Sequence, residues 1–240
     1  MPGRSNDVIF DNTYTSLPAT IQLRGNRSIL NLTFDTDDDL ALINGNGSRT
    51  LDLYGSSITQ TAASDGNHSL DFTTLRLRTN TTFDTSGSTG LTVSSAITES
   101  GGARTLTKTG SGNLIFTGSN TYSGLTTISD GTLVAAHANA LGSTAAGTTI
   151  GTGGILGLSG SITLANEAIA NSGLIENLSG SNAYGGVASG TGNLLVSGGT
   201  LTLSGSNTYT GTTTVNGSGT LALGADNALS DATAVTVNSG

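Results

Sequence analysis

The chain has 240 residues, a net charge of −8 and only 10% charged residues, against roughly 25% in an average soluble domain. It contains no cysteine, which excludes a disulfide framework and thiolate metal sites. No apolar run approaches the ~20 residues of a membrane-spanning helix. Thr, Ser, Gly and Asn together make up more than half of the chain. Because β-branched residues and leucine are also plentiful, the composition predicts an ordered, strand-rich protein rather than a disordered one.

The charges are distributed unevenly along the chain. All eight basic residues lie at or before Lys108, and the rest of the chain carries five acids and no Lys or Arg. Nucleic-acid binding needs clustered cations, so the sequence predicts no nucleic-acid partner, and it predicts no membrane insertion. Residues 1–5 are expected to be a leader left by cloning, and they contain no apolar signal-peptide core. If the protein is exported, its signal has been removed.

Short strand patterns occur along the whole chain. Each has three to five residues, alternates Leu with Thr or Asn, and is closed by Gly, Asn, Ser or Asp. Clear examples are, in order, 28–34, 50–53, 75–78, 199–203 and 220–223. Roughly 25 such segments are spaced about 8–10 residues apart, as repetitive β architectures require. The alternation predicts that Leu203 points inward and Thr202 outward.

One segment of the chain is repeated. Gly118-Ser-Asn-Thr-Tyr-Ser-Gly124 returns as Gly205-Ser-Asn-Thr-Tyr-Thr-Gly211, and a decayed copy spans 180–186. The copies begin at 118, 180 and 205. Their spacings fit about three turns and about one turn of a coil with roughly 20–25 residues per turn. Such a coil is a β-solenoid, in which stacked rungs bury a shared Leu/Ile/Val column. We therefore expect one solenoid of about ten rungs over residues 6–240. A propeller is the alternative fold, but no blade motif is present.

The repeated segment also resembles a known family. Residues 106–124, followed by Thr126-Thr-Ile128 and Asp130-Gly-Thr-Leu133, are similar to the autotransporter-associated β-strand repeat, and residues 192–223 match nearly as well. The resemblance covers 106–240 and is looser over the lead-in rungs, 6–105. It implies a right-handed parallel β-helix belonging to an exported bacterial surface protein, often an adhesin. The extracellular location therefore follows from the resemblance.

Few residues are candidates for catalysis. We expect His68 and His137 to be solvated turn residues, and serine is too frequent for any Ser-His-Asp spacing to carry meaning. An acidic cluster, Asp35, Asp37, Asp38 and Asp39, is a weak Ca²⁺ candidate, because hard oxygen ligands suit this ion. Arg76 or Arg78 standing near that cluster would suit a polysaccharide lyase. The alternative interpretation is a solvated acidic turn, and no cofactor is expected.

The repeat motif is expected to have a structural role. Asn120 and Asn207 should stack in amide ladders, and Tyr122 and Tyr209 should cap the column with wet hydroxyl groups. Gly124 and Gly211 should supply a positive φ at the turn that follows. Stacking of a carbohydrate on an exposed tyrosine ring is the alternative.

The sequence as a whole predicts a non-enzymatic structural or adhesive solenoid. A self-assembling filament or sheath and a polysaccharide-active enzyme are the alternatives. Two carboxylates and an arginine in one groove would indicate the enzyme. Expected partners are a host or surface glycan or protein receptor. A second copy is also expected, joined through the solenoid ends, because the strand pattern at 234–237 has no polar cap after it.

Overall fold

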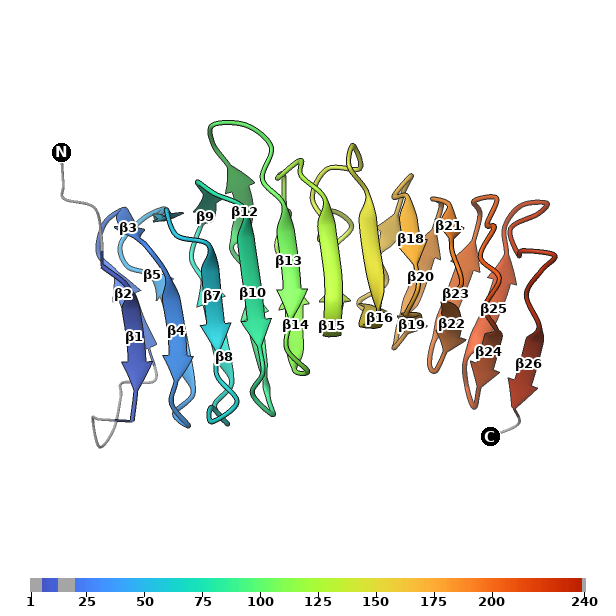
Figure 1. Ribbon diagram of the computed structural model, residues 1–240, viewed down its shortest axis with the longest axis horizontal. Helices are drawn as coiled ribbons and strands as arrows, with labels where there is room; N and C mark the ends of the chain where they lie inside the picture. Colours follow the sequence, from blue (N-terminus) through green and yellow to red (C-terminus); the bar gives the residue numbers. More distant parts are fainter. Residues whose placement is uncertain (1–5, 13–19, 239–240) are drawn as a thin grey trace.

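The computed structural model describes residues 6–12 and 20–238, which coil into a rod of stacked turns (Figure 1). The described residues form 26 strands and no helix, and every strand pairing is parallel. No membrane-spanning helix is therefore found in this part of the chain. The prediction of an all-β parallel solenoid of about ten turns is confirmed. The expected leader, residues 1–5, lies outside the described residues.

Each turn contributes to three faces of the rod, and one 18-stranded sheet supplies two of them. The first face consists of β1 (Val8–Asp11), β4 (Leu32–Asp35), β7 (Ser57–Gln60), β10 (Thr81–Thr85), β13 (Leu106–Thr109), β18 (Ile169–Asn171) and β21 (Ala188–Ser189). The second consists of β2 (Thr20–Leu23), β5 (Leu40–Asn44), β8 (His68–Asp71), β11 (Gly90–Val93), β14 (Asn113–Phe116), β19 (Leu174–Asn177), β22 (Asn193–Val196), β24 (Thr213–Asn216) and β26 (Val235–Asn238). Strands β15 (Thr126–Ala135) and β16 (Thr148–Leu158) bend across both faces.

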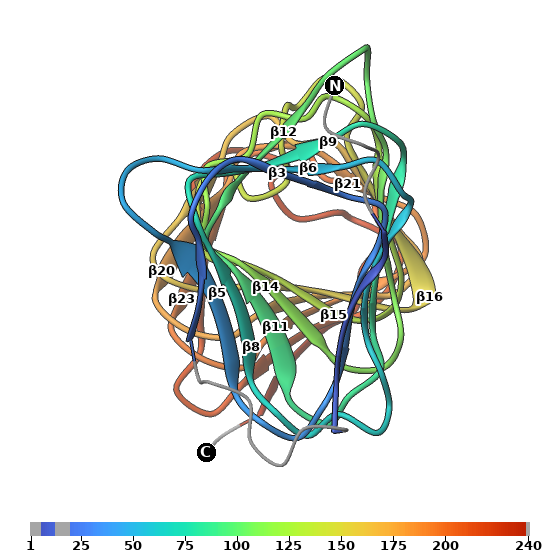
Figure 2. The ribbon, with the colours of Figure 1, turned by 90° about the vertical axis from the view of Figure 1, so that its left-hand side faces the viewer.

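Two four-stranded sheets form the third face. Sheet B contains β3 (Arg27–Ile29), β6 (Thr50–Leu53), β9 (Thr74–Leu77) and β12 (Ala96–Glu99). Sheet C contains β17 (Thr163–Leu164), β20 (Ser181–Tyr184), β23 (Thr200–Leu203) and β25 (Thr220–Leu223). Seen from the N-terminal end, the chain passes clockwise from β20 to β21 as it recedes, so the coil is right-handed (Figure 2).

The turns become shorter along the rod. In the N-terminal half, residues that pair across successive turns are far apart in sequence, as Leu32 with Ile58 and Leu40 with His68. Near the C-terminus, the paired residues Leu194 and Thr213 are closer in sequence. The later turns therefore have little chain to spare beyond the three strands and their corners.

The core is a column of inward side chains, as the Leu/Thr alternation predicts. On the first face Ile58, Phe83, Lys108 and Ile128 follow one another in register, and all four are fully buried. A lysine thus occupies a place that is apolar on the turns before and after it. The predicted orientation at β23 is confirmed, because Leu203 is 2% exposed while Thr202 lies half-buried on the outer side.

The last described strand, β26, pairs with β24 on one side. Val235 and Val237 are 50% and 74% exposed there. Association of solenoid ends stays a prediction.

Candidate functional site

The asparagine of the repeat holds three turns together. Asn120 is 3% exposed; its Oδ1 accepts a hydrogen bond from the Ile97 amide at 2.8 Å, and its Nδ2 donates to the Ala140 carbonyl at 2.6 Å. Asn207 makes the same pair of bonds, with the Ala188 amide and the Ala228 carbonyl. The prediction that these asparagines stack on one another in amide ladders is wrong. Each one bonds the backbone of the turns before and after it.

The tyrosine of the motif is buried together with its hydroxyl group. Tyr122 is 0% exposed and its Oη lies 2.7 Å from Thr126 Oγ1; Tyr209 Oη lies 2.6 Å from Thr213 Oγ1. The prediction of a wet hydroxyl is therefore wrong. Burial raises the pKa of both tyrosines above the usual value, so both stay neutral. Neither ring is available for stacking against a sugar.

The glycines after the motif are needed for close approach rather than for a positive φ, which neither Gly124 nor Gly211 adopts. A Cβ on Gly124 would lie 2.2 Å from the Arg104 carbonyl oxygen, and one on Gly211 would lie 2.1 Å from that of Gly192. The prediction of left-handed turns is wrong at both positions. Only a residue without a side chain lets the chain cross so near to the preceding turn.

The two clear copies of the repeat lie on different faces. The first copy begins on β14 and places Asn120 over sheet B, whereas the second begins on β23 and places Asn207 over β21. Asn120 and Asn182 both lie on the third face, and the chain makes three full turns between them. From Asn182 to Asn207 it makes one turn and one further face, not the single turn predicted. The motif therefore fits any of these corners.

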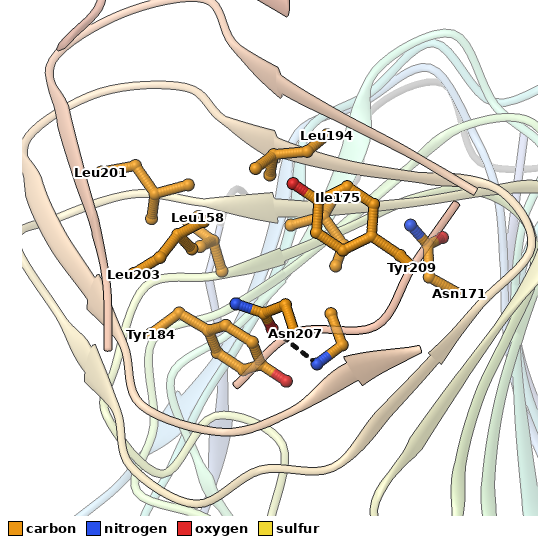
Figure 3. A pocket seen from close by; sticks show the side chains of 10 residues that line it. Leu158, Asn171, Ile175, Tyr184, Leu194, Leu201, Leu203, Asn207 and Tyr209 are labelled. Atoms are coloured by element: carbon orange, nitrogen blue, oxygen red, sulfur yellow. Dashed lines mark hydrogen bonds between the residues drawn. The ribbon is translucent and has the colours of Figure 1, made fainter. Parts of the chain in front are cut away.

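The space between the two later motif copies is filled by the core (Figure 3). Tyr184 and Tyr209 face a group of leucines there, and Asn207 accepts a hydrogen bond from the Ala188 amide beside them. The gap left between these side chains is about 10 Å³, which is at the lower limit for a single water. It is a packing gap rather than a ligand site.

His68 is buried, contrary to the prediction of a solvated turn residue. It is 1% exposed at the start of β8, its ring stacks on Phe34 with centroids 4.5 Å apart, and its Nε2 lies 2.8 Å from Ser64 Oγ. Burial lowers its pKa below the usual value. Ser64 is also fully buried, so this pair has no route to a substrate. His137 is half-buried and its Nδ1 accepts a hydrogen bond from the Asn139 amide at 3.0 Å, which is a turn contact.

Two further ionisable groups are buried, and the sequence reasoning missed both. The ammonium of Lys108 donates to the carbonyls of Thr109, Gly110 and Asp130 at 2.8, 2.6 and 3.1 Å, and burial lowers its pKa to about 8. Glu167 is 3% exposed, accepts a hydrogen bond from the Thr148 hydroxyl at 2.7 Å, and has its pKa raised by burial. The hydrogen bonds of Lys108 and Glu167 are all buried or partly buried within the rod, so both side chains have a structural role.

The acidic cluster does not converge on one point. Asp35 accepts a hydrogen bond from the Thr61 hydroxyl, Asp37 from the Asp65 amide at 3.2 Å, and Asp39 from the Asn67 amide at 2.7 Å. Asp38 stands in the same turn, and its amide donates to Thr36 Oγ1 at 3.2 Å. Within residues 6–12 and 20–238, no group of three or more acidic or histidine side chains is placed to hold a metal.

Arg76 and Arg78 do not accompany that cluster. Both lie on or beside β9 of sheet B and contact the carboxylate of Asp52, at 2.6 and 2.7 Å. These two guanidinium groups lower the pKa of Asp52 although its partial burial opposes them. The lyase-like combination of the acidic cluster with these arginines is absent from the described residues.

The comparison with known protein families agrees with this geometry. The model of the passenger-associated transport repeat matches residues 106–135, 196–217 and 216–240. The chain carries passenger-associated transport repeats, and these repeats on a β-solenoid fit a passenger-type β-helix repeat protein of the autotransporter kind. The matched segments cover about a third of it and include both clear copies of the motif, Asn120 and Asn207, while the decayed copy at 180–186 lies outside them. No curated protein and no solved structure matches the chain.

Proposed function

We propose that this passenger segment is a non-enzymatic, adhesive part of a protein exported to the bacterial surface. The observation that carries the proposal is the repeat itself. It occurs on a solenoid in which Asn120 and Asn207 join successive turns through hydrogen bonds, while Tyr122 is fully buried and bonded to Thr126 of its own turn. A rod built in this way is stabilised by its buried motif residues and its apolar column, and its outer faces are left for partners.

The surface hollows support a binding role over a catalytic one. One hollow is lined by Gln22, Arg24, Asn46 and Arg49, without a carboxylate. Another holds Asp226 and Asp231, in the part of the chain that has no Lys or Arg. Neither combines paired carboxylates with an arginine, which is the arrangement that would favour a polysaccharide-active enzyme.

Adhesion is tested with beads coated with the chain and matched beads coated with serum albumin. Both are passed over immobilised polysaccharides and extracellular-matrix proteins, and the chain-coated beads should be retained at least on one surface. Equal retention of both kinds of bead on every surface would contradict the proposal.

Catalysis and export are tested separately. The same polysaccharides, incubated with the soluble chain, should show no new reducing ends and no ultraviolet absorbance of unsaturated uronates. Fused between a signal peptide and an autotransporter barrel, the chain should become accessible to external protease on intact cells. Product formation, or a chain that stays inside, would refute the corresponding part of the proposal.

A further inference from the structure

Five arginines lie on or beside sheet B. Arg76 belongs to β9, and the others flank the strands of this sheet, which lies along the top of Figure 2. We call this surface the arginine face; it consists of Arg24, Arg49, Arg76, Arg78 and Arg104. The strands of sheet B carry only two acids, Asp52 and Glu99. The other nine acids before Lys108 lie outside these strands, so the first half of this acidic protein has a locally positive side.

One edge of the arginine face is hollowed. The hollow has a volume of about 350 Å³ and is lined by Gln22, Arg24, Asn46 and Arg49, a size typical of small-ligand pockets. Arg49 is held in place by its bonds to the carbonyls of Leu23, at 3.2 Å, and Ser48, at 3.0 Å. Arg24 has no hydrogen-bond or ion-pair partner among the described residues. The anchored guanidinium of Arg49, the guanidinium of Arg24 and the side-chain amides of Gln22 and Asn46 are all hydrogen-bond donors. Together they form a site that suits an anionic group.

The other edge of the arginine face carries an exposed aromatic ring. Tyr54 is 40% exposed, whereas Tyr122, Tyr184 and Tyr209 are buried, so it is the one exposed tyrosine in the part of the chain described. The Arg78 guanidinium lies 5.3 Å from its ring centroid. Arg78 is in turn anchored by Asp52 at 2.7 Å and by Ser100 Oγ at 2.9 Å.

The hollow and the ring lie on one outer surface. Arg49 directly precedes β6 and Tyr54 directly follows it, so the two are five residues apart along an extended strand, or ~17 Å at the usual rise. Between them the outward row of Ser28, Asp52, Arg76 and Thr98 crosses the sheet in register. A ligand that bridges the two edges is therefore extended, hydroxylated and acidic.

We propose that the arginine face binds an acidic polysaccharide, with a carboxylate or sulfate group in the Arg24–Arg49 hollow and a sugar ring against Tyr54. The proposal rests on the adhesive function and names the ligand class. Positive charge selects a polyanion, and an exposed tyrosine ring beside a guanidinium group suits a sugar face. Single-stranded nucleic acid would call for a series of aromatic platforms. A membrane surface would call for several apolar side chains that insert, whereas this surface offers, among the described residues, a single exposed leucine, Leu30, at its edge.

The test measures binding of the chain to heparin, polygalacturonate, dextran and poly(dT) in solution. We expect binding to the first two, none to neutral dextran, and weakening as NaCl rises from about 0.05 to about 0.3 M. Binding to dextran of equal strength, or to poly(dT) as tight as to heparin, would overturn the assignment to an acidic glycan.

The decisive variant is the double substitution Arg24→Gln with Arg49→Gln, which should weaken binding about tenfold or more. Asp226→Asn and Asp231→Asn, added to it, restore the net charge to −8 at a distant place. Affinity should then stay low; recovery to the original value would show that net charge alone drives binding. An unchanged affinity in the double variant would also overturn the proposal.

Asp52→Asn separates a binding surface from a merely structural cluster. It frees two guanidinium groups from their carboxylate, so polyanion affinity should rise, whereas Tyr54→Ser should lower it several-fold. Circular dichroism melts check that each variant is folded. If neither variant shifts the affinity, the assignment of this edge is wrong. Beads that still adhere with the arginine double variant would retain the adhesive function but refute this ligand class.

Discussion

Replacing Asn120 with alanine should be among the most damaging single changes to the rod. The side chain is 3% exposed and satisfies two backbone groups, the Ile97 amide and the Ala140 carbonyl. Truncation leaves both groups buried without a partner, at about 1–3 kcal/mol each, so the loss should be about 2–6 kcal/mol. Asn120→Asp should lose at least as much, because a carboxylate would face the Ala140 carbonyl.

Asn139→Ala is the matched control. Asn139 is exposed and its side chain makes one bond, to Ser119 Oγ at 3.2 Å. Its loss should therefore stay within about 0.5 kcal/mol. Urea unfolding gives the free energies, and hydrogen exchange at the Ile97 amide reports the bond directly. Similar losses for both variants, or an Ile97 amide that stays protected in Asn120→Ala, would refute the role assigned to this asparagine.

The interior and the acidic turn allow three further predictions. Leu203→Asp should destabilise the protein by several kcal/mol and Thr202→Asp by less than about 1 kcal/mol; equal shifts in melting temperature would contradict the register. Because the folded pKa of Lys108, about 8, lies below its unfolded value, the unfolded state holds more protons above that pH and stability should rise from about pH 8 to about 9.5. The rise should vanish in Lys108→Met, and a rise of equal size in the variant would exclude Lys108 as its source. Calcium should shift the melting temperature by less than about 2 °C relative to EDTA; a shift above about 10 °C would mean that residues 35–39 bind the ion.

The sequence was sufficient where the alternation of side chains is unbroken. On a straight strand, every second residue points inward, so the burial of Leu203 and the outward position of Thr202 follow from the pattern alone. The three turns between Asn120 and Asn182 were likewise predicted, because a solenoid repeats its faces at a nearly constant period. These inferences need no knowledge of side-chain contacts.

The corners were not predictable in the same way. At a corner the period of two is interrupted, so a polar residue such as Asn207 can turn inward and form hydrogen bonds there. Asn207 was expected to stack in an amide ladder, and instead it bonds the backbone of neighbouring turns. His68 was expected to be solvated, although it alternates with the inward Leu70 on β8, and it is buried. The turns near the C-terminus are shorter than the assumed repeat, so the later copy of the motif lies on a different face. From Asn182 to Asn207 the chain makes one turn and one further face rather than one turn.

The difference in turn length separates two roles along the rod. The later turns, such as the one that pairs Leu194 with Thr213, use nearly all of their chain for the three faces, and the matched repeats lie mostly there. The earlier turns, such as the one that pairs Leu40 with His68, are longer. Their corner segments, such as Gly45–Arg49, supply the walls of the surface hollow. Because a longer corner leaves the inward column unchanged, chain can be added for binding without a loss of core packing. The proposed recognition surface therefore lies in the longer turns, and the regular repeats supply the shaft that extends it.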